Sequence, residues 1–176
     1  MLAACATTPA NYLSAAEFEA RYPAAADTLA AGDVIRLSLY GDDAFTGEYQ
    51  VATDGTVSLP LIGAVQLAGQ TLEGARTAIE RSLRDGFYPQ ARVSAQLVSQ
   101  RPVYVLGEVA RPGSFPFVAD LTLSKAAALA GGYTPFASMK VAAVRRAGSA
   151  QEVVVEANQS LRLAPGDTVR ILSRSL

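Results

Sequence analysis

The sequence predicts an α+β protein made of two small domains, each a mixed sheet with one helix. Three observations support this fold class. Short runs of alternating apolar and polar residues, typical of half-buried strands, recur between turn residues such as Gly-Asp, Asp-Gly and Pro-Gly. Beyond the leader, two segments that follow Thr71 and Thr122 have the spacing or composition of helices. The same Gly-Asp strand entry occurs near both ends of the chain.

Residues 1–28 are predicted to form a leader and tether with one short helix. The segment is rich in alanine, and Ser14 with Glu17 three residues later has the sequence of a capping box. Pro23 lacks a backbone donor, so it limits the helix to one or two turns.

The first domain, residues 29–100, is expected to begin with strands at residues 34–39, 49–53, 56–59 and 65–67. Asp54-Gly55 favours a type I′ hairpin between the second and third of these strands, because both central residues of that turn need positive φ. Pro60 has no amide hydrogen and must end the third strand.

A helix is predicted to follow Thr71, whose hydroxyl is a favourable N-cap, and to end at Gly86. Its buried face should carry the apolar residues at helical spacing, Leu72, Ala75, Ile79 and Leu83. Charged residues four apart on its flank should form ion pairs, namely Arg76, Glu80 and Arg84. A strand at residues 93–97 completes this domain.

The second domain, residues 101–176, is expected to contain strands at residues 103–106, 141–144, 153–155 and 169–172. The second and third of these should pair as a hairpin. Thr122 should cap an alanine-rich helix from Leu123 to Ala130, which Gly131-Gly132 ends.

The composition limits the chemistry that this chain can perform. Its 176 residues are 50% hydrophobic, and the formal net charge is −1, which favours folded domains over a nucleic-acid-binding surface. The basic pair Arg145-Arg146 is interpreted as a solvated strand face. With no histidine and one cysteine, the chain cannot build a Ser-His-Asp triad, a Cys/His zinc site or an internal disulfide. We therefore expect no catalytic centre, metal or cofactor.

The first residues suggest a lipid anchor. Leu2-Ala3-Ala4-Cys5 has the pattern of a bacterial lipoprotein signal, in which small residues precede a cysteine that is acylated. A complete signal peptide also has a basic start and a longer apolar run. Because only four residues precede Cys5, the start is expected to be mis-assigned or shortened. The alternative is an incidental cysteine in an alanine-rich leader.

One short stretch occurs twice in similar form. LAAGDVIRL at residues 29–37 and LAPGDTVRI at residues 163–171 are identical or similar at seven of nine positions. Two copies so far apart do not indicate a solenoid. We interpret both as one tight turn that leads into an amphipathic strand.

Two regions resemble known domains. GDVIRLSLYG, followed by EYQVATDGTVSLPLIGAVQLAGQTLEGARTAI, resembles the polysaccharide export (Wza-like) family of outer-membrane proteins, over residues 31 to about 100. VYVLGEVARPGSF, followed by LTLSKAAALAGGYT, resembles the soluble-ligand-binding β-grasp (SLBB) domain that comes next in this family. The second domain is therefore expected to be β-grasp-like.

This resemblance implies a lipid-anchored protein on the periplasmic face of the outer membrane, which takes part in secreting a capsular or exopolysaccharide. Family members form homo-oligomeric rings around the exit path of the polysaccharide and dock above an inner-membrane polysaccharide co-polymerase. Ala6, in place of an aspartate after the cysteine, favours sorting to the outer membrane.

The sequence departs from the best-known members of that family in two ways. It shows one β-grasp domain where they have repeats, and no amphipathic membrane-crossing helix precedes Leu176. We therefore expect the protein to rely on a separate outer-membrane β-barrel for the last step, or the chain to be truncated.

Two alternative functions remain open at this level. An enzyme could use paired carboxylates for glycoside cleavage, drawn from Asp42, Asp43, Glu48 and Asp54, although solvated turn residues are the favoured interpretation. A ligand- or glycan-binding β-grasp module without a conduit role could let a ligand approach the backbone at Gly107 and Gly113. Its candidate sugar-stacking residues are Tyr104, Tyr133 and Phe136.

Leu61 and Ile62 follow the strand-ending Pro60 and raise a separate question. Exposed apolar residues at a strand end would suit a contact with the neighbouring subunit of a ring. The slightly favoured alternative is that both fold back under the helix after Thr71 and complete the core.

Overall fold

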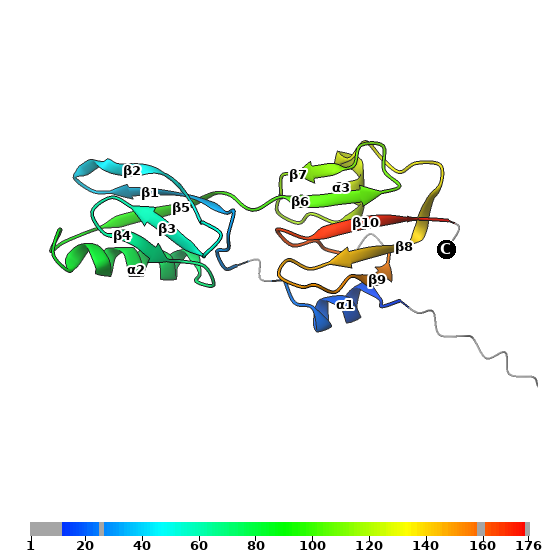
Figure 1. The fold of residues 1–176 in the computed structure, drawn as a ribbon, viewed down its shortest axis with the longest axis horizontal. Helices are drawn as coiled ribbons and strands as arrows, with labels where there is room; N and C mark the ends of the chain where they lie inside the picture. The colour runs from blue at the N-terminus through cyan, green and yellow to red at the C-terminus, as the bar shows by residue number, and fades with distance from the viewer. Residues whose placement is uncertain (1–11, 25–26, 158–160, 175–176) are drawn as a thin grey trace, which may run out of the picture.

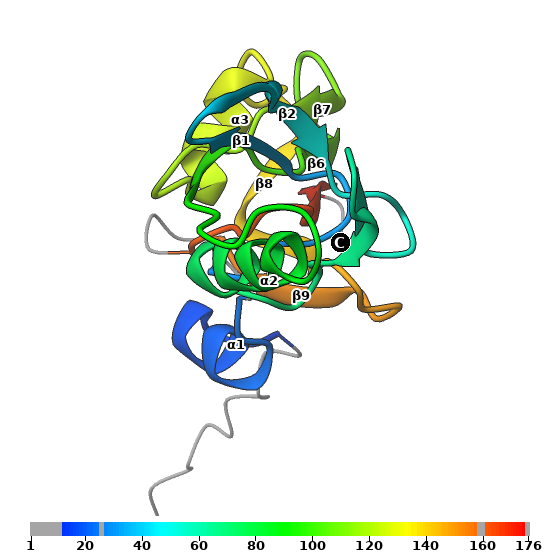
Figure 2. The same cartoon turned by 90° about the vertical axis from the view of Figure 1, so that its left-hand side faces the viewer.

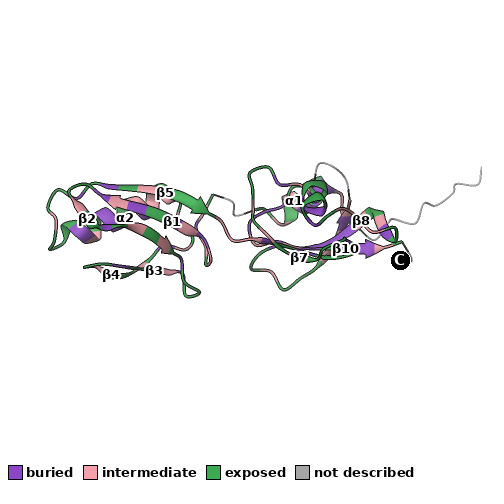
Figure 3. Cartoon of the chain, turned by 90° about the horizontal axis from the view of Figure 1, so that it is seen from above, coloured by how far each residue is buried: buried purple, intermediate pink, exposed green. Residues whose placement is uncertain are grey.

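The computed structural model describes residues 12–24, 27–157 and 161–174, and these form two units arranged along the long axis of the molecule (Figure 1). Each unit has a hydrophobic core of its own. We call residues 27–100 the first unit, and residues 12–24 together with those from 101 onward the second unit. Figure 3 shows buried residues within each of them. The α+β fold class is confirmed, and we propose the two units as the protein's domains.

The first unit is a three-stranded antiparallel sheet covered on one face. The sheet has the order β2-β1-β5 and is built from β1 (Val34–Leu39), β2 (Asp42–Gln50) and β5 (Val93–Ser99). Helix α2 (Leu72–Arg84) and the hairpin of β3 (Thr56–Leu59) and β4 (Gly63–Gln66) pack on the face that carries Ile35 and Leu37 (Figure 2). As predicted, Thr71 caps α2, whose buried face includes Ala75, Ile79 and Leu83.

The chain reverses at Asp54-Gly55 as predicted: the Gly55 amide donates to the Ala52 carbonyl (2.9 Å) and the Ala52 amide to the Thr56 carbonyl (2.8 Å). The predicted type I′ turn and the predicted strand pairing are wrong. β3 pairs with β4, from Thr56 opposite Gln66 to Leu59 opposite Gly63, and not with β2. A type I′ turn needs positive φ at both central residues, and among the described residues Gly55 has it (+84°) but Asp54 does not. The Asp54 carboxylate accepts hydrogen bonds from the amide (2.9 Å) and hydroxyl (2.8 Å) of Thr56.

The turn of the actual hairpin contains Pro60, Leu61 and Ile62. Ile62 packs against the first core, as the favoured interpretation predicted. Leu61 does not: it has φ +69° and is 54% exposed. Pro60 therefore ends β3 and begins a turn that leaves Leu61 exposed and places the next residue, Ile62, against the core.

The second unit is a five-stranded mixed sheet of order β7-β6-β10-β8-β9. Its strands are β6 (Val103–Gly107), β7 (Gly113–Phe115), β8 (Ala137–Arg145), β9 (Val153–Glu156) and β10 (Thr168–Ser173). β10 runs parallel to β6 and antiparallel to β8. The predicted pairing of β8 with β9 is confirmed. Helix α3 (Leu123–Leu129), capped by Thr122 as predicted, packs on one face, which gives the expected β-grasp-like arrangement.

Helix α1 (Ala15–Arg21) belongs to the core of the second unit. Its predicted capping box between Ser14 and Glu17 is present. Phe18 is fully buried among the second-unit side chains, and Leu13 exchanges backbone hydrogen bonds with β9, from its amide to the carbonyl of Val154 (3.0 Å) and from the amide of Glu156 to its carbonyl (2.8 Å). The chain therefore passes from the second unit to the first and then returns.

The repeated Gly-Asp turn has a buried ion pair that the sequence interpretation missed. Asp33 and Asp167 are both 0% exposed, and each accepts a hydrogen bond from the amide three residues earlier, at 2.9 and 2.8 Å. Asp33 pairs with Arg101, whose Nη1 lies 3.0 Å from Oδ2, and Asp167 pairs with Arg146. Both copies therefore have the same arrangement, in which an aspartate closes its own turn and forms an ion pair with an arginine distant in the sequence.

Arg146 corrects the interpretation of the basic pair as a solvated strand face. Arg145 is exposed, but Arg146 is buried, with its guanidinium 4.7 Å from the centre of the Phe18 ring. Burial raises the pKa of Asp167 above its ordinary value, and the charge of Arg146 opposes that effect.

Candidate functional site

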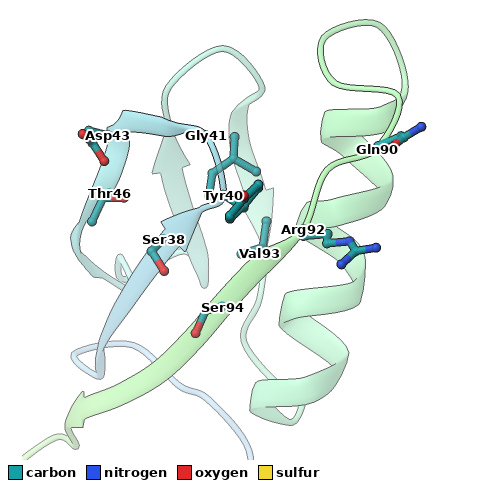
Figure 4. A pocket seen from close by; sticks show the side chains of 10 residues that line it. Ser38, Tyr40, Gly41, Asp43, Thr46, Gln90, Arg92, Val93 and Ser94 are labelled. Atoms are coloured by element: carbon teal, nitrogen blue, oxygen red, sulfur yellow. The ribbon is translucent and has the colours of Figure 1, made fainter.

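A hollow with both polar and apolar lining residues lies at the end of the first unit remote from the second. Its volume is about 960 Å³, and it is bordered by the end of β1, the turn into β2 and the segment that leads into β5 (Figure 4). We call it the distal hollow. Its polar lining consists of Ser38, Asp43, Thr46, Gln90, Arg92 and Ser94.

Tyr40 stands at this hollow on a short turn. Gly41 has φ +86°, a conformation that glycine adopts without strain, and it lets the chain reverse at once from β1 into β2. The amide of Tyr40 donates to the carbonyl of Arg92 (3.1 Å), which ties the turn to the segment before β5. The Tyr40 side chain is 90% exposed. The turn therefore fixes the backbone and presents a free aromatic ring beside the polar groups.

These groups suit a ligand rich in hydroxyl groups. Hydroxyl, amide, carboxylate and guanidinium side chains supply both donors and acceptors, and an exposed tyrosine ring adds an apolar face with a polar tip. The hollow is open and its lining mixes polar and apolar groups, so it suits weak contacts better than enclosure of a small molecule. Among the described residues no cluster of three or more potential metal ligands occurs.

The carboxylates of the enzyme alternative are held by separate neighbours. Asp42 accepts hydrogen bonds from the Tyr88 hydroxyl and from the Ala44 amide (2.9 Å), which lower its pKa. The amide and hydroxyl of Thr56 lower the pKa of Asp54. Glu48 pairs with Arg36 across β1 and β2, and Asp43 lines the distal hollow. A general acid of a glycosidase needs a raised pKa, so the geometry does not support that alternative.

The predicted sugar-stacking residues are not brought together. Tyr133 is bridged to Val109 and packs against the second core. Tyr104 lies at the start of β6, where its amide donates to the Asp167 carbonyl (2.9 Å). Phe136, which is 70% exposed, precedes β8 and bonds through its carbonyl to the Arg174 amide (2.8 Å) near the end of β10. β6 and β10 run parallel, so these two positions lie at opposite ends of the sheet.

Gly107 is explained by packing rather than by ligand access. A Cβ atom there would lie 2.1 Å from the carbonyl oxygen of Ile171, and φ is +83°. Gly113 has open space around its Cα. Cys5, the predicted lipidation site, lies outside the described residues.

Sequence reasoning missed the distal hollow. Its parts come from two segments about fifty residues apart, and neither contains a motif for binding. A large aromatic residue placed directly before a turn glycine, as in Tyr40-Gly41, was the one available signal.

The chain thus contains two small α+β units, and each has one strand that a Gly-Asp turn leads into. Residues 22–98 match the polysaccharide biosynthesis/export protein family, and residues 102–155 match the SLBB domain. The chain therefore carries a polysaccharide biosynthesis/export domain followed directly by an SLBB domain.

Characterised relatives are matched over part of their length. The chain is 36% identical over 91 residues to the exopolysaccharide production protein ExoF of Rhizobium meliloti strain 1021, across 51% of this chain and 22% of ExoF. It is 31% identical over 106 residues to the polysialic acid transport protein KpsD of Escherichia coli, across 59% of this chain and 19% of KpsD. The match thus spans about a fifth of each relative. Within the described part of the chain, no helix is both long and apolar enough to span a membrane.

Proposed function

We propose that this protein is a lipid-anchored component of a complex that secretes a capsular or exopolysaccharide. In this proposal it forms a homo-oligomeric ring on the periplasmic face of the outer membrane, which conducts the glycan toward the cell surface. The observation that carries the proposal is the tandem of export and SLBB domains, which occupies most of the chain. The names of the two relatives, exopolysaccharide production and polysialic acid transport, support the same substrate class.

The position of α1 gives the proposed complex a direction. Cys5 precedes Tyr12 by seven positions, and Leu13 is bonded to β9 of the second unit. An acylated Cys5 would therefore hold the second unit next to the membrane. The first unit, with the distal hollow at its free end, would point away from that membrane (Figure 1). That end would meet the inner-membrane co-polymerase, and a separate outer-membrane β-barrel could complete the path.

The distal hollow would then contact the glycan as it arrives. A conduit needs contacts that guide a moving chain without holding it, because a tight site would stop transport. Open polar side chains around one exposed tyrosine meet this requirement. In a ring, each copy would present the hollow to the central path through the same rotation.

Secretion in a strain that lacks the gene tests this function. The wild-type protein should restore surface polysaccharide, whereas the double variant Tyr40→Ala, Arg92→Ala should restore much less at equal protein level. The matched control is Tyr104→Ala, Arg145→Ala, which removes another exposed tyrosine and arginine pair, in the second unit. Unchanged polysaccharide secretion after deletion of the gene would refute the proposed function.

The anchor and the ring are tested by mass measurement of the protein extracted in detergent. We expect Cys5 to carry acyl chains, and the Cys5→Ser variant to lack them. The mass of the extracted complex should be an integer multiple of the subunit mass. If the exposed turn at Leu61 contacts a neighbouring subunit, Leu61→Glu should lower the number of subunits per complex without unfolding the subunit. A strictly monomeric, fully secretion-competent protein would exclude the ring.

A further inference from the structure

The open face of the second sheet carries an apolar groove. α1 and α3 contribute to the core on the other face, on the side of Val105, Val144 and Val169. The groove has a volume of about 740 Å³ and its lining is mostly apolar. Its main lining residues are Tyr12, Met139, Lys140, Val154, Leu172 and Arg174. We call it the end groove, because it lies where β8 begins and β10 ends, away from the first unit (Figure 1).

Large apolar side chains are exposed around this groove. Phe136 is 70% exposed and Met139 is 61% exposed, and Tyr12 at the groove wall is 41% exposed. The Phe136 segment is held against the groove by two hydrogen bonds, from the Arg174 amide to its carbonyl (2.8 Å) and from the Arg174 Nε to the Ala137 carbonyl (3.2 Å). Clustered exposed apolar residues of this kind mark a surface that contacts another phase or partner.

The charge of the groove favours an anionic partner. Lys140 and Arg174 line it directly. The neighbouring Arg170 is paired with Glu152, so this pair adds no net charge. Glu156 lies opposite Val141 in the β8–β9 register and is the nearby acidic residue to set against the two cations. An apolar slot with an excess of basic side chains matches the acyl-chain boundary and phosphate groups of an anionic bilayer.

The short segment between Cys5 and Tyr12 indicates that the end groove lies close to a membrane. Seven residues reach at most about 25 Å when fully extended. Since Tyr12 is itself a wall of the end groove, an anchor at Cys5 would keep the groove within that distance of the bilayer. This step rests on the proposed function, whereas the exposed residues and the charge do not.

We propose that the end groove docks on the surface of an anionic phospholipid membrane. Phe136 and Met139 enter the headgroup region, while Lys140 and Arg174 contact lipid phosphates. A lipid anchor alone leaves the protein free to tilt, whereas the anchor and this face together hold the subunit upright. The first unit would then project along the membrane normal.

Vesicle binding by the unacylated protein, Cys5→Ser, tests this proposal without the anchor. We expect binding to vesicles of phosphatidylethanolamine with phosphatidylglycerol, with weaker binding at high salt and to vesicles without phosphatidylglycerol. Lys140→Gln should lower the partition coefficient about fivefold, because each basic residue near an anionic surface contributes about that factor. Phe136→Ser should lower it at least as much, through lost apolar contact.

The chain supplies matched controls for both variants. Lys125→Gln removes a lysine on the covered side of the sheet, at α3, and Tyr40→Ser removes an exposed aromatic residue in the first unit. Both should bind vesicles as the parent does, and circular dichroism should show all variants folded.

No binding to phosphatidylglycerol vesicles, or equal losses in the controls, would overturn the docking proposal. So would a Phe136→Ser variant that dissociates oligomers but binds vesicles normally, because the groove would then be a subunit interface. Vesicle binding by a protein whose Cys5 carries no acyl chain in cells would support docking and refute the anchor of the proposed function.

Discussion

Removing either buried aspartate of the repeated turn should destabilise one unit and leave the other nearly unchanged. Asp33 closes a turn of the first unit and Asp167 a turn of the second, and both are 0% exposed. Arg101, the partner of Asp33, is the first residue where the chain returns to the second unit. In Asp33→Ala, the amides of Ala30 and Arg101 lose an acceptor that lies 2.9 and 2.8 Å away. The guanidinium of Arg101, with its side chain 13% exposed, also loses its partner.

The size of the effect follows from these losses. Each buried group left without a partner costs about 1 to 3 kcal/mol, and removal of one member of a buried ion pair costs about 3 to 5 kcal/mol as a whole. We therefore expect each variant to lower the unfolding free energy of its own unit by about 3 to 5 kcal/mol. That is a large share of the roughly 5 to 15 kcal/mol typical of a domain.

Urea denaturation followed by hydrogen exchange and mass spectrometry separates the two units, because peptides report on each core. Asp33→Ala should lower protection in β1 and α2, and Asp167→Ala should lower it in β8 and β10. Glu48→Ala, which breaks the exposed pair with Arg36, is the control and should change little. A loss below about 1 kcal/mol for both aspartate variants, or destabilisation of the opposite unit, would refute this account of the turns.

Two further variants test packing and pH dependence. Gly107→Ala should destabilise the second unit by several kcal/mol, because the added methyl group would collide with the Ile171 carbonyl and φ at this position is positive. Gly113→Ala, where the added methyl group meets open space, should be nearly neutral. Thermal unfolding compares the two variants, and equal melting temperatures would contradict the packing argument. The pKa of Glu80 is lowered below 4.5, first by the hydrogen bond that the Val93 amide donates to its carboxylate. The stability that this carboxylate contributes is therefore present above pH 4.5 and is lost as pH falls through the lowered pKa. Between neutral and acid pH the urea midpoint should fall less for Glu80→Gln than for wild type, and an equal fall in both proteins would contradict this.

Local patterns predicted the elements that depend on nearby residues. The capping box at Ser14, the N-caps at Thr71 and Thr122 and the buried face of α2 were confirmed, because their partners lie within one turn of the chain. At Asp54-Gly55 the chain reverses as predicted, but Asp54 does not take positive φ and β3 pairs with β4. A dipeptide signal predicts the reversal and does not specify which strand the returning segment pairs with.

Features that join distant segments could not be predicted in the same way. Asp33 and Arg101 are 68 positions apart, and no periodic pattern connects them. The interpretation of both Gly-Asp stretches as tight turns that lead into a strand was correct for the backbone, but it did not include the arginine that each aspartate binds. The distal hollow likewise needs both the Tyr40 turn and the segment before β5. Recognition of the hollow requires the fold first, although the fold class and the order of the two domains were accessible from sequence.

The placement of α1 makes the first unit an insertion within the second. Phe18 fills the second core from the N-terminal side, and the rest of that core follows residue 101. A fragment that starts at residue 101 would lack this ring and expose the surface that it covers. The ribosome must therefore release the first unit before the second can close, and the chain crosses between the two units twice rather than once.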